Sequence, residues 1–190
     1  MAGVRQVEGS RSARMLLLVL LPTLLVTITP SSFVQAVDVV QAGYWLGSVA
    51  ITSTNFNVNF QTHVLYAFAG IDGSYNTVPP SDDNGQYKTF TATAHKSNPR
   101  VKTLLSIGGG ASDPTVFAAM ASTAANRKVF IDSSIALARK YGFSGLDLDW
   151  EFPADQTEMA NMGILFREWN VATKIEAAVS RKPKLLLTGK

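Results

Sequence analysis

The sequence predicts a parallel α/β fold, and among such folds a (β/α)8 TIM barrel. Short apolar runs are continuous rather than alternating, as expected of strands buried on both faces, and segments of helical periodicity separate them. Carboxylates gather at the carboxyl end of one run, where barrel enzymes hold their chemistry. An open doubly wound sheet is the alternative, but the first run ends in Gly43-Tyr44-Trp45 and no Gly-x-Gly-x-x-Gly turn follows it.

The elements follow in order along the chain. Candidate strands are residues 40–45, 63–70, 102–107, 145–150 and 184–188, and candidate helices are residues 115–122, 127–141 and 158–179. In the last helix one face is apolar, which predicts packing against the sheet through Met162, Leu165, Phe166 and Trp169. A complete barrel needs eight strands and about 250 residues, so we expect a barrel truncated after about five strands.

Three acids, Asp147, Asp149 and Glu151, stand at every second position of the fourth run. On a strand, this spacing puts their side chains on one face. The opposite face is expected to carry the apolar residues between them, Leu146, Leu148, Trp150 and Phe152. Like charges about 7 Å apart in a half-buried row cannot all ionise cheaply, so at least one carboxyl should stay protonated near neutral pH. A protonated carboxyl can serve as a general acid.

Three other interpretations of the acid row fit its residues less well. A solvated acidic edge would not need four large apolar residues opposite. A calcium loop would want glycine and further oxygen ligands after the second aspartate, where Trp150 stands. A metal site lacks nearby histidines, because His63 and His95 are the only two and both lie well upstream. Acid/base catalysis without a metal or cofactor is therefore the leading hypothesis.

The acid row resembles the catalytic signature of family 18 glycoside hydrolases, Asp-Gly-x-Asp-x-Asp-x-Glu. Gly145 and the three acids match it, whereas Ser144 stands at its first aspartate. Upstream, residues 106–109 read Ser-Ile-Gly-Gly and resemble the second family signature, Ser-x-Gly-Gly. The surrounding residues 102–110 and 130–135 are most similar to plant class V chitinases, and the likeness extends from about residue 41 to residue 188.

The resemblance implies a retaining mechanism in which the substrate supplies its own nucleophile. It assigns proton donation to the glycosidic oxygen to Glu151 and orientation of the 2-acetamido group to Asp149, with Asp147 sharing a proton with Asp149. The implied substrate is chitin, or oligosaccharides of β-1,4-linked N-acetylglucosamine. Tyr44 and Phe68 fall where the family lines its sugar site, with a core position as the alternative for each.

Two further substrate-site features come from the Ser-x-Gly-Gly segment. Ser106 is expected to hydrogen-bond the base of the acid row, with an ordinary strand-end serine as the alternative. Gly108 and Gly109 are expected to allow close backbone approach at the mouth of the barrel. A phosphate-binding loop is disfavoured because no Lys-Ser/Thr pair follows the glycines.

The composition of the chain limits the number of domains and argues against disulfides and nucleic-acid binding. The chain has 190 residues, of which 46% are hydrophobic, so it can bury one core but hardly two. It contains no cysteine, which excludes disulfides. Three arginines and one glutamate in residues 1–36 carry most of the formal net charge of +3, so nucleic-acid binding has little electrostatic support.

Residues 1–36 are predicted to be a secretory signal peptide. Arginines precede an apolar stretch at 15–28, and Val34-Gln35-Ala36 offers small residues for cleavage after Ala36. A membrane anchor is the alternative, but the stretch is shorter than about 18 residues and Pro22 interrupts it. We expect residues 37–190 to be the N-terminal portion of a catalytic barrel. The protein is expected to be secreted to the extracellular space, with the vacuole as the alternative destination. After removal of the signal peptide it should be free of the membrane, and when full length it should be a monomer.

The expected function is that of a secreted chitinase. A carbohydrate-binding or inhibitor protein on the same scaffold is the alternative function.

Overall fold

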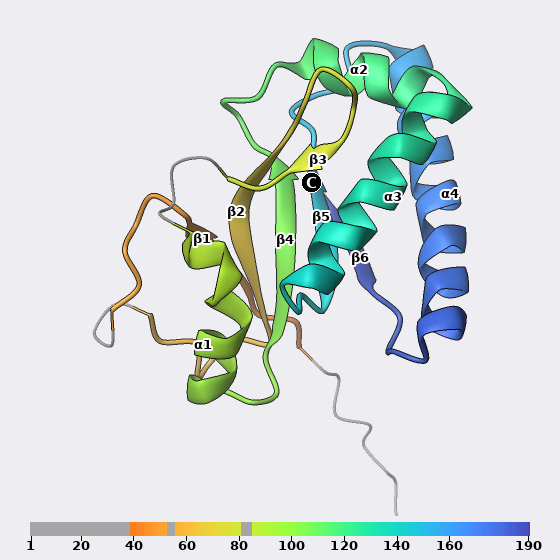
Figure 1. Ribbon diagram of the computed structural model, residues 1–190. Coiled ribbons are helices and arrows are strands. Elements are labelled where there is room, and N and C mark those ends of the chain that lie inside the picture. The colour runs from red at the N-terminus through yellow and green to blue at the C-terminus, as the bar shows by residue number, and fades with distance from the viewer. Residues whose placement is uncertain (1–38, 53–55, 81–84) are drawn as a thin grey trace, which may run out of the picture. The chain divides into compact units, whose positions relative to one another are not determined.

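The computed structural model describes residues 39–52, 56–80 and 85–190, so the predicted signal peptide lies outside the described residues. Five parallel strands form one sheet in the order β1-β2-β4-β5-β6, and the short β3 pairs antiparallel with β2 (Figure 1). The parallel strands are β1 (Ala42–Leu46), β2 (His63–Ile71), β4 (Lys102–Gly108), β5 (Gly145–Asp149) and β6 (Leu186–Gly189). All five predicted strands are confirmed.

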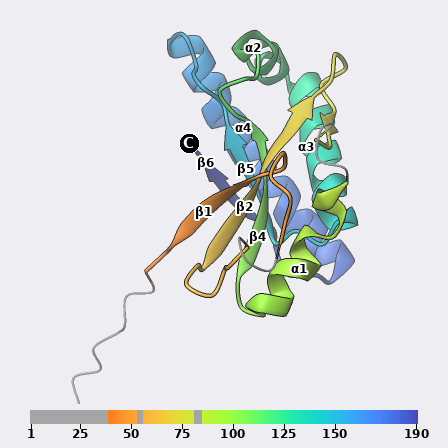
Figure 2. The same ribbon diagram turned by 90° about the vertical axis from the view of Figure 1, so that its left-hand side faces the viewer.

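Helices cover one face of this sheet (Figures 1 and 2). They are α1 (Phe90–Ser97), α2 (Pro114–Ser122), α3 (Ala124–Lys140) and α4 (Gln156–Ser180), and a 3-10 turn, η1 (Gln86–Lys88), precedes α1. The three predicted helices are confirmed as α2, α3 and α4. Within the described ranges, no helix is both long enough and apolar enough to cross a lipid bilayer.

Side-chain caps explain why the helices begin earlier than the apolar periodicity suggests. Asp113 accepts a hydrogen bond from the backbone N–H of Thr115 at 2.9 Å, with proline at the first helical position of α2. At the start of α4, Asp155 accepts from the backbone N–H of Glu158 at 2.8 Å, and Glu158 accepts in turn from the Ala154 N–H. These caps satisfy backbone donors that the first helical turn leaves free.

Helix α1 and strand β3 were not predicted from the sequence. The α1 segment, Phe-Thr-Ala-Thr-Ala-His-Lys-Ser, has threonines of low helix propensity and only a short apolar pattern. Its helix is stabilised by burial of Phe90, whose ring lies 4.8 Å from that of Tyr66 on β2. Strand β3 (Thr77–Val78) has only two residues, too few for a periodic signal.

Strand β5 divides the core from the acid row. Leu146, Leu148 and Trp150 are almost fully buried on the helix-covered face. The prediction for Phe152 was wrong, because its side chain is 65% exposed. The strand ends at Asp149, so the alternation of faces does not continue to residue 152. The acids therefore run from the middle of β5 to just beyond its end, on the face that the helices leave open.

Candidate active site

Asp147 is held by hydroxyl groups from three other strands. Ser106 on β4 and Thr188 on β6 stand in register with it on either side, and their hydroxyls donate at 2.7 and 2.6 Å. Tyr44 on β1 donates to the same carboxylate at 3.1 Å. Because Asp147 is only 2% exposed, these three donors replace the water that an exposed carboxylate would bind.

Thr188 was not among the residues singled out from sequence. The signal that could have found it is its register: it occupies the next strand, directly beside Asp147. Parallel neighbours in register point to the same face, so a threonine there is within reach of the acid row. Ser106, by contrast, was expected at the base of the row, and the structure places it there.

Asp149 is the last residue of β5 and is 3% exposed. Burial raises the pKa of its carboxyl above the ordinary value, and the neighbouring carboxylates Glu151 and Asp147 raise it further, while Lys190 opposes the change. Its Oδ1 atom is buried and has no hydrogen-bond partner among the described residues. An unsatisfied acceptor of this kind is available to a donor from a ligand.

Glu151 lies two residues beyond the strand and is more open, with 22% of its side chain exposed. The Lys190 ammonium donates a hydrogen bond to its Oε1 atom and lies 3.9 Å from Asp149 Oδ1. This contact lowers the pKa of Glu151. The sequence led us to expect at least one protonated acid in the row, and the structure assigns the raised pKa to Asp149, whereas Lys190 favours an ionised Glu151.

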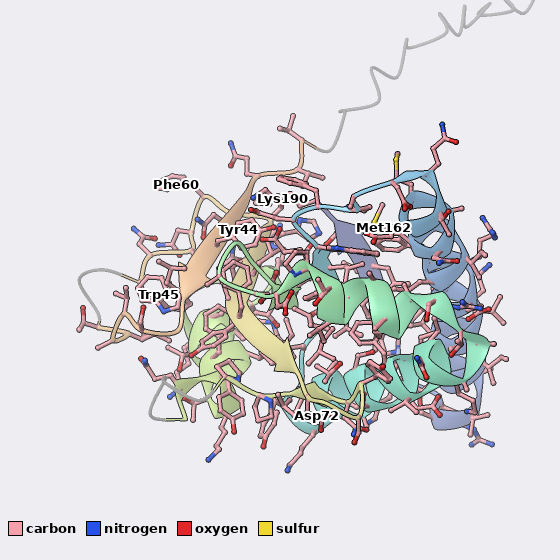
Figure 3. The ribbon with its side chains drawn as sticks, turned by 90° about the horizontal axis from the view of Figure 1, so that it is seen from above. Tyr44, Trp45, Phe60, Asp72, Met162 and Lys190 are labelled. Carbon is pink, nitrogen blue, oxygen red and sulfur yellow. The ribbon has the colours of Figure 1, made fainter. Side chains whose placement is uncertain are left out.

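Tyr44 and Phe68 lie beside one another at the open face, with ring centroids 6.0 Å apart. Tyr44 is 47% exposed and Phe68 is partly exposed, so neither belongs to the buried core. Burial and the nearby Asp147 raise the pKa of the Tyr44 hydroxyl, which therefore remains a neutral donor. Tyr44 and Lys190 approach the acid row from β1 and from the end of β6 (Figure 3).

Two glycines let the end of β4 lie against the end of β5. Gly108 has φ 117°, and a Cβ there would meet the Asp149 carbonyl oxygen at 2.2 Å. Gly109, with φ 87°, donates its N–H to the same oxygen at 2.9 Å, and a Cβ would meet the Phe68 ring at 2.8 Å. The glycines thus position the Asp149 backbone and make room for Phe68.

The histidines lie away from the acids. The His63 ring contacts the neighbouring Thr62 hydroxyl at 2.8 Å, and the His95 ring contacts the Val101 carbonyl at 3.1 Å. Among the described residues, no group of three or more histidine, aspartate or glutamate side chains is arranged to hold a metal ion.

Among known proteins, the chain is similar to chitinases and to a chitinase-like agglutinin. A class V chitinase from Arabidopsis thaliana is 50% identical over 154 residues, covering 80% of this chain and 41% of that protein. A solved GH18 chitinase from Cycas revoluta in complex with (GlcNAc)3 is 40% identical with a TM-score of 0.72, covering 80% of this chain and 45% of that one. A chitinase-like agglutinin from Robinia pseudoacacia is 45% identical with a TM-score of 0.73, covering 78% of this chain and 45% of that one.

The chain therefore spans about two-fifths of the length of these relatives. The structural matches confirm the predicted fold class, with the five parallel strands forming part of a TIM-barrel architecture. Residues 40–189 match the sequence model of Glycosyl hydrolases family 18, and the chain belongs to this family.

Proposed function

We propose that the protein carrying this chain is a glycoside hydrolase that cleaves β-1,4-linked N-acetylglucosamine polymers with retention of configuration. The observation that carries the proposal is the pairing of a buried Asp149, whose pKa is raised, with a more open Glu151 two residues later. Chemically different carboxyls side by side suit a reaction that needs one group to orient the substrate and another to transfer a proton. The chitin oligosaccharide in the Cycas revoluta complex supports the substrate class.

In the proposed mechanism, the Oδ1 atom of Asp149 accepts a hydrogen bond from the N–H of the substrate's 2-acetamido group. The acetamido carbonyl oxygen attacks the anomeric carbon as the glycosidic bond breaks, and Glu151 gives its proton to the leaving oxygen. Water then opens the resulting oxazolinium ion, with Glu151 taking the proton back. Asp147 shares a proton with Asp149. The aromatic rings of Tyr44 and Phe68 pack against the apolar face of the sugar ring.

The ion pair between Lys190 and Glu151 opposes the protonation of Glu151 that this mechanism needs. Glu151 must be protonated to act as the acid, and the ion pair with Lys190 favours its ionised form. The Lys190 side chain is 54% exposed, so it has room to turn away when a sugar enters. We propose that productive binding displaces the ammonium from Glu151.

The decisive experiment replaces the acid with its amide in the full-length protein. Glu151→Gln keeps the shape but removes the transferable proton, so kcat on a chitin oligosaccharide should fall at least about 100-fold while binding persists. Asp132→Asn, an equivalent change at an exposed position on α3, serves as the control. Near-normal turnover by Glu151→Gln would refute the catalytic assignment.

Substrate assistance has its own test. An oligosaccharide with a free amine in place of the acetamido group at the cleaved sugar should not turn over, and the first product anomer should be β. Proton NMR during early hydrolysis distinguishes the two anomers. An initial α product would exclude the retaining mechanism.

A carbohydrate-binding protein without turnover is the second candidate. It is favoured by the Lys190–Glu151 ion pair and by the agglutinin among the solved relatives. The two functions separate in one experiment, because a binding protein would retain its affinity for chitin oligosaccharides and release no product over long incubation.

We also propose that residues 1–36 are a cleaved signal peptide, that residues 37–190 belong to the catalytic barrel, and that the mature protein is secreted as a monomer, with the vacuole as the alternative destination. The apolar stretch at 15–28 supports this proposal. N-terminal sequencing of the protein from culture medium should begin at Val37, and an intact leader on membrane-bound protein would contradict it.

A further inference from the structure

Lys190 forms the only ion pairs that the acid row makes in the described part of the chain. Its backbone N–H donates to the Leu148 carbonyl at 3.1 Å, so the residue is fixed beside the end of β5. Its ammonium donates to Glu151 Oε1 and lies 3.9 Å from Asp149 Oδ1. A single side chain therefore compensates the negative charge at the site of proton transfer.

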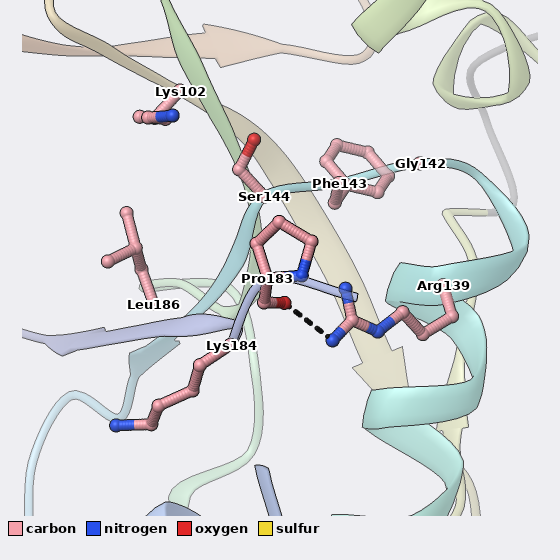
Figure 4. Close-up of a pocket in the computed structure, with 8 residues that line it drawn as sticks. All are labelled: Lys102, Arg139, Gly142, Phe143, Ser144, Pro183, Lys184 and Leu186. Atoms are coloured by element: carbon pink, nitrogen blue, oxygen red, sulfur yellow. Dashed lines mark hydrogen bonds between the residues drawn. The ribbon is translucent and has the colours of Figure 1, made fainter. Parts of the chain in front are cut away.

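Two other lysines near the sheet lie at its opposite end. Lys102 is the first residue of β4 and Lys184 lies two residues before β6, and both line a pocket of about 280 Å³ there (Figure 4). The acid row reaches the carboxyl end of β5, where Asp149 stands in register with Gly108, the last residue of β4. Without Lys190, the acid row would have no ion-pair partner among the described residues.

An ionised Glu151 affects one class of leaving group more than another. A sugar alcohol leaves poorly as an alkoxide, so its oxygen must take the Glu151 proton as the bond to the anomeric carbon breaks. A phenol can leave as the phenolate. The bonding electron pair then stays on the phenolate oxygen, the acetamido oxygen forms the new bond to the anomeric carbon, and no proton is transferred. The ion pair therefore removes a group that only the first reaction needs.

We propose that Lys190 is a specificity-determining residue that directs the site toward N-acetylglucosaminides with acidic leaving groups, such as aryl glycosides. This inference rests on the proposed function, because it uses the same acids and the same attack by the acetamido group. Sugar leaving groups require displacement of the ammonium, whereas aryl leaving groups are cleaved with the ion pair intact. The ionised Glu151 then takes a proton from the water that opens the oxazolinium ion and passes it to the phenolate or to solvent.

Lys190 also acts on Asp149, where its charge opposes the raised pKa of the carboxyl. This effect is the same for both classes of substrate, because both depend on Asp149 to orient the acetamido group. It should therefore change both rates by the same factor. A comparison of leaving groups on one sugar donor cancels this factor and isolates the proton that Glu151 supplies.

The test measures kcat/KM of the full-length protein on a series of aryl chitobiosides that differ only in the acidity of the phenol. This parameter covers the steps up to bond cleavage and excludes the later attack of water. For the parent, log kcat/KM should rise steeply with the acidity of the phenol. Lys190→Met should flatten this dependence. It should also raise kcat/KM on a chitin tetrasaccharide at least about five-fold relative to the most acidic aryl substrate.

Matched variants separate the charge from the structure. Lys190→Arg keeps the cation and should keep the steep dependence, and Lys190→Gln should behave as Lys190→Met does if the methionine variant folds poorly. Lys174→Met removes an exposed cation from α4 and should match the parent. Circular dichroism of each variant verifies the fold.

The outcomes distinguish this inference from the function on which it rests. Equal slopes for the parent and for active Lys190→Met and Lys190→Gln would overturn the role of Lys190 and leave the proposed hydrolase standing. A flattened slope in Lys190→Arg would also overturn it, since the charge would then not be the cause. Absence of turnover on every substrate, by the parent and by all variants, would refute the proposed function and the inference with it.

Discussion

Thr188→Val tests whether β6 helps to hold the acid row. The valine has the same shape and favours a strand, so the change removes mainly the hydroxyl that donates to Asp147 at 2.6 Å. A hydrogen bond to a charged group contributes about 1.5–3 kcal/mol. Because Thr188 is exposed and water can partly replace the hydroxyl, we expect the lower end, a loss of about 1.5 kcal/mol in the free energy of unfolding.

Urea denaturation of the full-length protein measures this loss. With an m-value of about 2 kcal/mol/M, the midpoint should fall by roughly 0.7 M. Thr188→Ser keeps the donor and should restore most of the stability. Equal midpoints for the valine and serine variants would refute the reasoning, since the hydroxyl would then contribute nothing that water does not supply.

Three further changes probe the site and its support. Lys190→Met should raise the pKa of Glu151, because Lys190 lowers it, and should move the basic limb of the kcat/KM profile to higher pH. Arg127→Met should lower the free energy of unfolding by about 3 kcal/mol, because this residue is 6% exposed and binds Glu168 through two nitrogens, at 2.8 and 2.9 Å. Asp149→Asn should raise the melting temperature at pH 7 while abolishing turnover. The pKa of Asp149 is raised in the fold, so its stability contribution falls as pH rises from the ordinary aspartate value through the raised one.

Each change has a matched control on the helical surface. Lys174→Met should leave the pH profile unchanged, and an equal shift would show a general charge effect. Lys128→Met removes a 74% exposed cation and should cost less than about 0.5 kcal/mol. Asp132→Asn should leave the melting temperature nearly unchanged. If Asp149→Asn were less stable than the parent at pH 7, burial would not be the cause of its raised pKa.

The sequence predicted the strands well because their signal is local. Each of the five runs is continuous in hydrophobicity, and the inner strands β2, β4 and β5 are buried over most of their length, whereas the outer strands β1 and β6 are exposed or half-buried. Because side chains alternate between the two faces of a strand, the sequence also predicted that Asp147 and Asp149 share a face. Alternation failed at Phe152, where the strand had already ended. Short elements such as α1 were missed because their stability comes from tertiary burial rather than from propensity.

By itself, the sequence determined the fold class, the family and the identity of the three acids. Only the tertiary structure decided how those acids differ. Asp149 is buried and its Oδ1 atom has no hydrogen-bond partner among the described residues, whereas Glu151 accepts a hydrogen bond from the Lys190 ammonium, which comes from a residue 39 positions away along the chain. The physical reason is that a pKa depends on burial and on charges within a few ångströms. Those neighbours are set by strand order and register, which bring side chains from β1, β4 and β6 to the acids of β5.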